Sequence, residues 1–364
     1  MTKHNNVQRI AIVLSFAIFF LIGCTTITKN NHSSHVDYAD EQGVIIQKVT
    51  DPDLRFVFYE NRGVPGFTAF AFGVTSSEIG EVDIYYGRIE VSSSETPLIA
   101  KLQHLSETDF EFVFKVFLNY EEIPFRILGE DEWRTEFFFS LESEYRIDIP
   151  FVVDIEFPAD NYSYKLTAGI FVDPNRHEIN KDNHASIFST HGMVLNSELI
   201  LGSGGEIRFD LPPETIPQER QEDFGVFRLF VTQEFELNEW GFVSYPDFIT
   251  QVNRGEKIEL SFYASPFTAD YELENYLIIG MLNWQQIPLN GQPFLFVDAQ
   301  NHGFENLLDF GTFTIDAIDE VGKHDLVLII IENPKKPNTS INSFSINSFF
   351  PLEISNRLVI EVIE

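Results

Sequence analysis

Apolar and polar residues alternate along most of the chain after residue 43. Three segments carry aromatic or branched side chains at every second position over much of their length: Asp109–Tyr120, Arg134–Ile149 and Val226–Leu237. A period of two built from such residues is typical of half-buried β-strands. Amphipathic helical stretches of three turns are not found after residue 24, and clusters of Gly, Pro, Asn and Asp separate the strands. The pattern predicts an all-β protein made of antiparallel β-sandwiches rather than α/β layers.

Two parts of the chain resemble each other in three places, in the same order. "LNYEEIP" (Leu118–Pro124) matches "LNWQQIP" (Leu282–Pro288). "KLTAGIFVDP" (165–174) matches "DLVLIIIENP" (325–334), and "LNSELILG" (195–202) matches "ISNRLVIE" (354–361). The offset between the matched segments is nearly constant, which predicts a tandem repeat of one sandwich.

The boundary between the two units is expected in Gly202–Asp223, where glycine, proline and acidic residues gather. We therefore expect a first domain over 44–204, a linker over 205–221 and a second domain over 222–364. Each is large enough to bury a core of its own. The strand-to-strand corners of the repeat resemble those of immunoglobulin-like or fibronectin-type modules of surface proteins, a resemblance of fold class that has no diagnostic motif.

The amino-terminal segment has the layout of a signal peptide. Residues 1–9 carry Lys3 and Arg9 and no acid, and the next 14 residues, "IAIVLSFAIFFLIG", are apolar apart from Ser15. That run is short for a membrane-spanning helix, which needs about 20 apolar residues. We expect residues 1–23 to be a cleaved signal segment.

The signal segment ends in "LIGC" (Leu21–Cys24), which resembles the lipobox of bacterial lipoproteins. The resemblance implies that the thiol of Cys24 takes a diacylglycerol through a thioether and that a peptidase cuts before it. The lipid bilayer is then a partner, through acylated Cys24, and the protein lies on the extracytoplasmic face of the cell membrane. The alternative is a buried free cysteine in an uncleaved anchor helix, which leaves the chain on the same side.

Residues 24–43 are expected to form a lipidated flexible spacer, because they are polar and show neither a helical nor a strand period. Cys24 is the single cysteine of the chain. Once it carries lipid, neither a disulfide nor a thiolate metal site can form.

The net charge of the chain limits the kinds of partner that it can bind. The chain has 24 basic and 56 acidic residues, and removal of Lys3 and Arg9 leaves 22 against 56, a formal net charge of −34. Binding to nucleic acid needs a basic surface, so no nucleic-acid partner is expected. Anionic lipid headgroups also repel such a chain, and membrane contact is expected to rest on the lipid.

Known catalytic motifs are missing from the sequence, which has no G-x-S-x-G elbow, H-E-x-x-H, P-loop or G-x-G-x-x-G before a helix. The polar cluster Asp173–His184, followed by His191, fits neither a calcium loop nor a zinc pattern. We expect a solvated loop there, without metal or cofactor. Asp131 with Glu132, and Asp154 with Glu156, are carboxylate pairs of the kind that glycosidases use. No catalytic residue is assigned, and a carbohydrate-active hydrolase stays the alternative to a non-catalytic binding or structural protein.

The repeated "LN-aromatic-x-x-IP" element has two interpretations. As structure, the aromatic residue packs over a turn that asparagine tolerates and proline ends. As function, Tyr120 and Trp284 are exposed at the same loop of both domains and stack on a glycan or on a surface protein. These two residues are the candidate binding residues.

Overall fold

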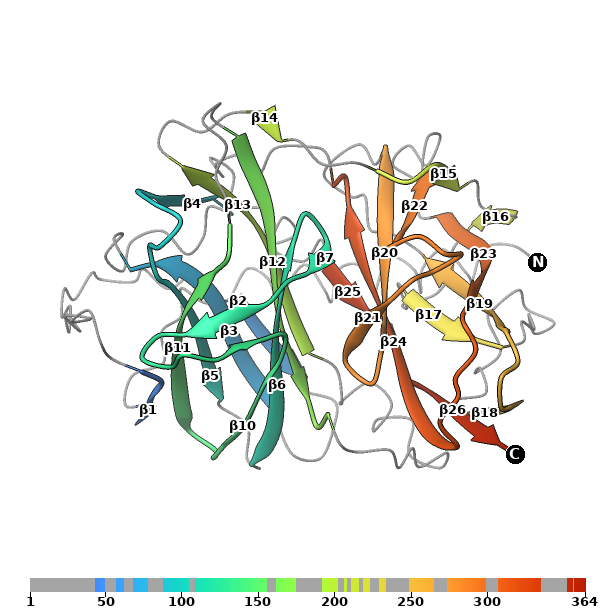
Figure 1. The fold of residues 1–364 in the computed structure, drawn as a ribbon, viewed down its shortest axis with the longest axis horizontal. Coiled ribbons are helices and arrows are strands. Elements are labelled where there is room, and N and C mark those ends of the chain that lie inside the picture. Colours follow the sequence, from blue (N-terminus) through green and yellow to red (C-terminus); the bar gives the residue numbers. More distant parts are fainter. Residues whose placement is uncertain are drawn as a thin grey trace, which may run out of the picture. The chain divides into compact units, whose positions relative to one another are not determined.

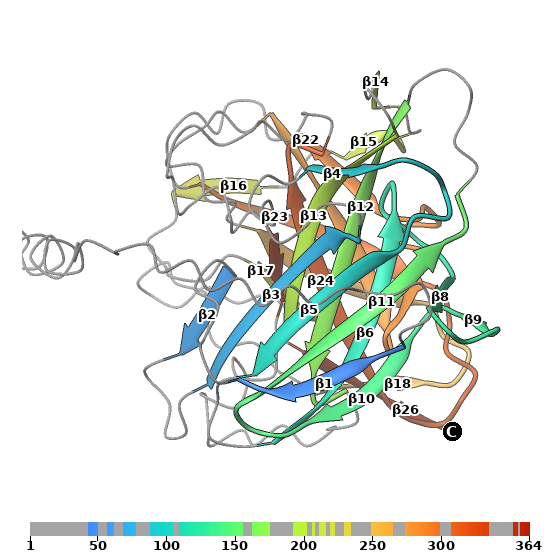
Figure 2. The same cartoon turned by 90° about the vertical axis from the view of Figure 1, so that its left-hand side faces the viewer.

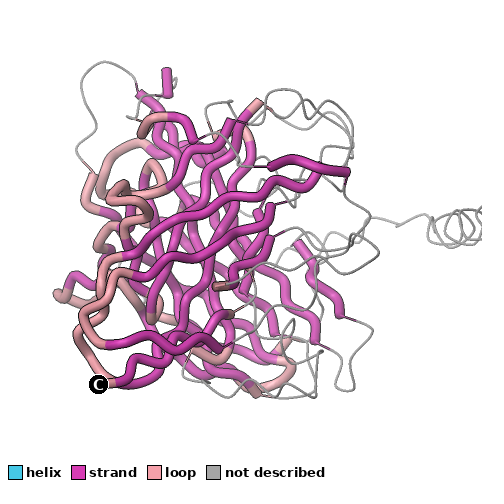
Figure 3. The backbone as a smooth tube through the Cα atoms, turned by 90° about the vertical axis from the view of Figure 1, so that its right-hand side faces the viewer, coloured by secondary structure: helices cyan, strands magenta, loops and turns pink. Residues whose placement is uncertain are grey.

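The residues that the structure describes form four β-sheets. The computed structural model describes residues 43–49, 57–61, 68–77, 88–104, 109–155, 162–174, 192–201, 206–207, 211–215, 219–222, 229–233, 249–264, 274–298, 307–334, 352–355 and 357–364. Every regular element among these residues is a strand, as Figure 3 shows by colour. The all-β prediction is confirmed.

Two sheets form the first sandwich. Sheet A runs in the order β2-β3-β5-β11-β8-β9, with β1 beside β11, and sheet B runs β10-β6-β12-β13-β4, with β7 beside β6 and β14 beside β12. Figure 2 shows β3, β5 and β11 of sheet A side by side. The strands of sheet A are β1 (Ile45–Lys48), β2 (Val57–Asn61), β3 (Thr68–Ser76), β5 (Leu98–His104), β8 (Phe125–Ile127), β9 (Trp133–Arg134) and β11 (Tyr145–Val153). Those of sheet B are β4 (Arg88–Val91), β6 (Phe110–Leu118), β7 (Glu121–Glu122), β10 (Phe137–Leu141), β12 (Tyr162–Val172), β13 (Gly192–Leu201) and β14 (Glu206–Ile207).

Two further sheets form the second sandwich. Sheet C runs β15-β22-β20-β24-β26-β18, with β21 beside β20 and β25 beside β24, and sheet D runs β16-β23-β19-β17. Sheet C consists of β15 (Glu214–Thr215), β18 (Ile249–Asn253), β20 (Asn275–Leu282), β21 (Gln285–Ile287), β22 (Leu295–Asp298), β24 (Gly322–Glu332), β25 (Leu352–Ile354) and β26 (Leu358–Ile363). Sheet D consists of β16 (Glu219–Glu222), β17 (Leu229–Thr232), β19 (Ile258–Ala264) and β23 (Leu307–Ile315). In Figure 1, β20 lies beside β24 as β6 lies beside β12.

The strand pairings of the two sandwiches correspond. The order β6-β12-β13-β4 in sheet B is matched by β20-β24-β26-β18 in sheet C. Leu199 is paired with Ile89 in the first sandwich, and Val359 is paired with Ile249 in the second, so the same offset in sequence relates both members of the pair. Most pairings are antiparallel, as expected, but β4 with β13, β14 with β12, β15 with β22, and β18 with β26 are parallel. Both sandwiches belong to one compact unit, Asp40–Glu364.

The segment expected to link the domains contains short strands. Glu206–Ile207 pairs with β12 of the first sandwich, whereas Glu214–Thr215 pairs with β22 of the second. Sheet membership therefore changes between Ile207 and Glu214. The expected linker, 205–221, contributes its backbone to sheets on both sides of that change.

Each sandwich has an aromatic-rich core between its two sheets. In the first, the rings of Phe114, Phe125 and Phe151 meet edge to face at centroid distances of 5.1, 5.2 and 6.0 Å. In the second, Phe262 and Phe313 lie 6.4 Å apart. Burying a ring of this size stabilises the fold by about 1.5–3 kcal/mol. The buried phenylalanines of these two cores are Phe72, Phe112, Phe114, Phe125, Phe151, Phe262 and Phe313.

Substitution of Gly311 in β23 tests how tightly the second core is packed. It is paired with Phe262, whose ring covers the place that a side chain on residue 311 would take. Gly311→Ala should lower the free energy of unfolding by about 1–3 kcal/mol, because the buried ring must move. Chemical denaturation measures this loss. Gly43→Ala is the control, since its added methyl would lie 3.6 Å from the nearest atom, the oxygen of Leu128, and an equal loss in both variants would contradict the prediction.

Candidate functional site

Two hairpins at equivalent positions carry the candidate binding residues. Asn119 and Tyr120 connect β6 to β7, and Asn283 and Trp284 connect β20 to β21. All four residues have positive φ: 50° and 71° in the first hairpin, 48° and 68° in the second. Two residues of positive φ define the type I′ turn, in which glycine usually follows asparagine. An aromatic residue in this conformation costs about 1–3 kcal/mol, which the rest of the structure must offset.

The asparagine of each turn fastens the hairpin to the next strand. Asn119 donates its backbone N–H to the oxygen of Lys165 (2.7 Å), and its side-chain oxygen accepts from the N–H of Lys165 (3.0 Å). Asn283 makes the same two bonds with Asp325, at 2.8 and 2.9 Å. The sequence needs asparagine here because its short side chain tolerates positive φ and bonds locally.

The two aromatic side chains reach across to the other sandwich. The hydroxyl of Tyr120 donates to the carbonyl oxygen of Pro334 (3.0 Å), and the indole N–H of Trp284 donates to the carbonyl oxygen of Pro174 (2.8 Å). These two prolines are equivalent in the repeat, because each ends the second of the repeated segments. The contacts are therefore reciprocal: each hairpin binds the proline bend of the opposite sandwich. We call the two hairpins and the two prolines the hairpin clamp.

The hairpin clamp lies at the edge of a third apolar cluster, formed by residues of sheets B and C. Trp284 packs against Phe171 at a centroid distance of 5.2 Å, and Tyr120 lies edge to face with Phe294 at 6.1 Å. The buried members of the cluster are Val113, Phe117, Tyr120, Phe171, Leu277, Ile279, Met281, Trp284, Phe294, Val327, Ile329 and Ile331. Strands β6 and β12 of sheet B and strands β20 and β24 of sheet C are thus buried on both faces, one in a sandwich core and the other in this cluster.

Polar groups around the clamp are paired across the two sandwiches. Gln286 donates its backbone N–H to Glu122 (2.8 Å), and its side-chain oxygen accepts from the N–H of Glu122 (2.5 Å). The amide nitrogen of Gln286 donates to the oxygen of Tyr120 (3.0 Å). Lys115, which is fully buried, forms ion pairs with Glu122 and, at 3.5 Å, with Glu136. These contacts satisfy groups that the apolar cluster would otherwise leave unpaired.

Arg357 also links the two sandwiches, next to the indole ring of Trp284. Its guanidinium lies 5.1 Å from the centre of the indole ring and donates to the oxygens of Val172 and Asp173, each at 3.1 Å. Asp325 lies 3.7 Å from it as a counter-ion. The arginine of the second sandwich thus binds the backbone just before Pro174.

The expectation that Tyr120 and Trp284 are exposed is wrong. Their exposed fractions are 0% and 5%. The physical reason is that each has a large apolar ring and one polar donor, so both parts are satisfied together by an apolar cluster with a carbonyl at its edge. Burial raises the pKa of the Tyr120 hydroxyl above its ordinary value, and the group stays a donor.

The sequence carries a signal for this burial apart from the alternation of apolar and polar residues. "LVLIIIE" in β24 and "YLIIGML" in β20 are almost continuously apolar, and such runs are typical of strands covered on both faces. The strict alternation of a half-buried strand would have left one of these faces polar.

The carboxylate candidates that the structure describes are exposed. Asp131 and Glu132 are exposed on the turn between β8 and β9, and Glu132 lies 3.4 Å from Arg134. Asp154 is exposed. Cys24, Glu156 and His191 lie outside the described residues, as do the members of the polar cluster after Pro174: Asn175, His177, Glu178, Asp182 and His184. Within the described ranges, no group of three or more His, Cys, Asp or Glu side chains is arranged to hold a metal ion.

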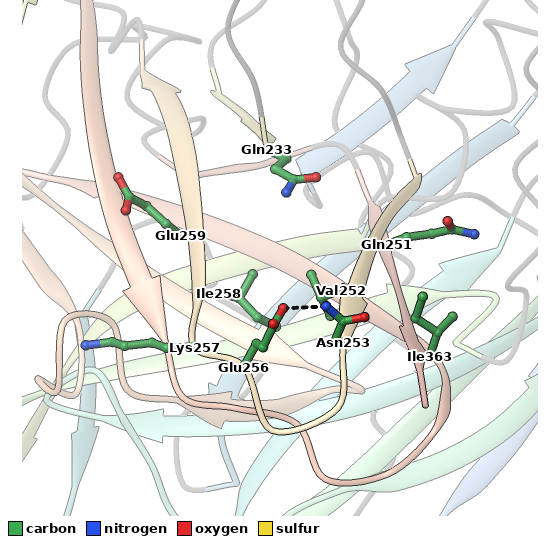
Figure 4. Close-up of a pocket in the computed structure, with 9 residues that line it drawn as sticks. All are labelled: Gln233, Gln251, Val252, Asn253, Glu256, Lys257, Ile258, Glu259 and Ile363. Atoms are coloured by element: carbon green, nitrogen blue, oxygen red, sulfur yellow. Dashed lines mark hydrogen bonds between the residues drawn. The ribbon is translucent and has the colours of Figure 1, made fainter.

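A shallow polar hollow of about 300 Å³ lies where β18 turns into β19. Val252, Ile258 and Ile363 are its apolar lining residues, and the amide of Asn253 donates to Glu256 at 3.0 Å. Figure 4 shows Lys257 and Gln251 pointing to opposite sides of the hollow rather than toward one another. The side chains therefore do not converge on a point where a small ligand or a reacting atom would lie.

No protein-family model and no curated protein sequence matches the chain. Among solved structures, it is similar to the C-terminal domain of the Streptococcus agalactiae AgI/II polypeptide BspA, with 10% identity and a TM-score of 0.21 over 80% of this chain and 99% of the other. It is also similar to the C-terminal domain of the Streptococcus pyogenes antigen I/II-family protein AspA, with 9% identity and a TM-score of 0.20 over 80% and 98%. Similarity at this level carries no inference about what this chain binds. The search for helices that could span a membrane finds none in the described parts of the chain.

Removal of the clamp should destabilise the fold. Tyr120→Phe should lower the free energy of unfolding by about 1–3 kcal/mol, because the buried oxygen of Pro334 loses its donor, and Trp284→Ala by about 3–5 kcal/mol, because a cavity remains. Denaturant titration measures both losses. Glu121→Ala and Gln285→Ala alter exposed residues of the same hairpins and should stay within about 0.5 kcal/mol of wild type; equal stability of all four variants would show that the clamp does not stabilise the fold.

The burial of Lys165 predicts how the stability of the protein depends on pH. Burial lowers the pKa of Lys165 to about 8, against the opposing effect of Glu198 beside it. The unfolded chain, with a lysine pKa of about 10.4, then binds more protons than the folded chain between pH 8 and 10.4, so stability rises with pH in that window. The stability of wild type relative to Lys165→Met should increase by about 3 kcal/mol from pH 7 to 10.5.

Urea titrations of the two proteins at each pH measure this difference, and the tyrosines, which both proteins share, cancel in it. A difference that is constant over the whole range would mean that Lys165 keeps its ordinary pKa in the folded chain.

Proposed function

We propose that this protein is a non-catalytic lipoprotein, anchored through acylated Cys24 to the extracytoplasmic face of the bacterial cell membrane, with a binding or structural role at the cell surface. The "LIGC" segment supports the anchor, and residues 24–43 act as a spacer between the bilayer and the folded part. The partner is a surface protein or a glycan. Neither nucleic acid nor a bound cofactor has a role.

The observation that carries the proposal is the reciprocal hairpin clamp. The two aromatic side chains that a sequence reader would assign to a ligand platform are used to join the sandwiches, with Tyr120 on Pro334 and Trp284 on Pro174. An apolar interface of this kind suppresses the relative motion that tandem domains otherwise have. A rigid body on a tether suits a protein that presents a binding surface to a partner or acts as a structural spacer.

Charge supports the same role. With 22 basic and 56 acidic residues after cleavage, the folded part is repelled by anionic headgroups and stays away from the bilayer, while the acyl chains hold the tether. A single acyl chain holds a protein only marginally, so two or three chains are needed. A lipid anchor and an acidic body therefore act together to keep the sandwiches outside the headgroup layer.

Cys24→Ala tests the anchor. The variant has no thiol to take diacylglycerol, so it should accumulate as a larger precursor and incorporate no labelled fatty acid. Cys24→Ser is the matched control for side-chain size and should behave in the same way. Labelling and cleavage like those of wild type would disprove the lipobox assignment.

The role itself is tested separately by incubating the purified protein with a panel of polysaccharides. Release of reducing ends above that of a heat-denatured sample would replace the non-catalytic role with the hydrolase alternative. No release is expected at any pH between about 4 and 8, the range in which carboxylate pairs act.

A further inference from the structure

One edge of β10 (Phe137–Leu141) has no partner strand in the part of the chain that the structure describes. β10 pairs with β6 and ends the path of sheet B. Phe138, in its middle, is 46% exposed, and Ser140 is exposed as well. A strand edge of this kind offers unpaired N–H and C=O groups on which another strand can form.

The pairing shows which residues of β10 face the free edge. Asp173 donates its N–H to the oxygen of Glu111 (2.8 Å), so the backbone of Glu111 faces β12. Backbone groups alternate along a strand, so the next residue, Phe112, faces β10, where its partner is Phe139. The residues between the bonded pairs, Phe138 and Ser140, therefore direct their N–H and C=O groups away from β6, toward the free edge.

In the second sandwich, the equivalent strand edge is paired with another strand. β22 pairs with β20 as β10 pairs with β6: Phe296 is opposite Leu277, and Phe138 is opposite Val113, the residue equivalent to Leu277 in the repeat. On its outer side β22 is covered by β15, in which Glu214 is paired with Phe296. Phe296 is 4% exposed, against 46% for Phe138. The repeat itself thus shows that this edge takes an extended segment.

We propose that the free edge of β10 is a docking site for an extended peptide segment of a partner protein, which adds a strand next to Phe138 and Ser140 as β15 does next to Phe296. The proposal rests on the binding role proposed above and states where that binding occurs. Backbone hydrogen bonds supply affinity in this mode, and pockets for alternate side chains supply selectivity. An apolar residue of the guest would cover Phe138.

The charge at both ends of β10 indicates the chemistry of the guest. Glu136 and Glu142 flank the strand, and Glu142 is exposed. Glu136 already pairs with Lys115 at 3.5 Å and Glu144 with Lys48 at 3.3 Å, so Glu142 contributes most to the negative charge at this edge. A second copy of this chain would bring Glu136 opposite Glu142 when two β10 strands pair antiparallel about Phe139, and like charges opposite one another are destabilising. A segment of alternating apolar residues with lysine or arginine at its ends fits the edge.

Hydrogen exchange on the full chain in detergent gives the first test. The amides of Phe138 and Ser140 should exchange rapidly in the free protein, whereas the amide of Phe296, bonded to β15, should be protected. Addition of the probe peptide KKTVTVTVKK should protect Phe138 and Ser140 and leave Phe296 unchanged. Protection of Phe138 equal to that of Phe296 before any peptide is added would overturn the proposal, because the chain would then fill its own edge.

Fluorescence anisotropy of the same peptide gives the second test. Phe138→Pro removes an outward N–H without removing a bond to β6, and it should weaken binding at least about tenfold. Phe138→Thr is the matched control: it keeps the N–H and should bind more tightly than the proline variant. The peptide with N-methyl groups at alternate residues should also lose at least about tenfold on the wild-type chain, where no folding defect can intervene.

Three results would overturn the proposal: no binding of the probe to wild type at about 1 mM, equal binding of the N-methylated peptide, or equal binding of EETVTVTVEE. Dimerisation of wild type that Phe138→Pro abolishes would also overturn it, in favour of a second copy. Fatty-acid labelling and the polysaccharide assay do not depend on Phe138, so the anchor and the role can fail or stand independently of the edge.

Discussion

The rest of this structure depends on one constraint: β6 and β12 of sheet B, and β20 and β24 of sheet C, are buried on both faces. A sandwich covers only the inner face of each of its sheets, yet β20 and β24 carry apolar residues on both. Leaving Ile279, Ile329 and their neighbours in water would cost about 25 cal/mol for each Å² of apolar surface. The two sandwiches are therefore one folding unit in energetic terms, although each has a core of its own.

The hairpin clamp closes the edge of this buried interface, where its polar groups form hydrogen bonds between the two sandwiches. Tyr120 and Trp284 sit in a turn position where glycine is usual, and the backbone strain this causes is offset by the burial of each ring against the opposite sandwich. Because equivalent residues make equivalent contacts in both directions, the interface has the character of a twofold contact between two copies, retained within one chain.

The two sandwiches differ where function is to be expected. The clamp is near-symmetric, but Lys165 stands where the second sandwich has Asp325. Among the described residues, no strand pairs with the outer edge of β10, whereas β15 pairs with that of β22. The buried contacts are the same in both halves of the repeat, so both halves contribute to stability. The strand edge differs between the halves, which suggests that the first half contacts the partner. In the proposed assignment, the anchor positions a rigid body and the free edge of that body makes the contact.

From its sequence alone, the chain could be recognised as all-β and as a duplication, because strand periodicity and repeated turns are local properties written into short segments. "LNYEEIP" and "LNWQQIP" were likewise identifiable as equivalent turns, with asparagine in its expected role. What surrounds a turn is not local: whether Tyr120 meets water, a ligand or Pro334 depends on a residue in the other half of the chain. The same holds for β10 and β22, whose sequences both read as apolar strands. Only tertiary pairing decided that the edge of β22 is covered by a segment with the composition of a linker, and that β10 has no such partner in the part of the chain that the structure describes.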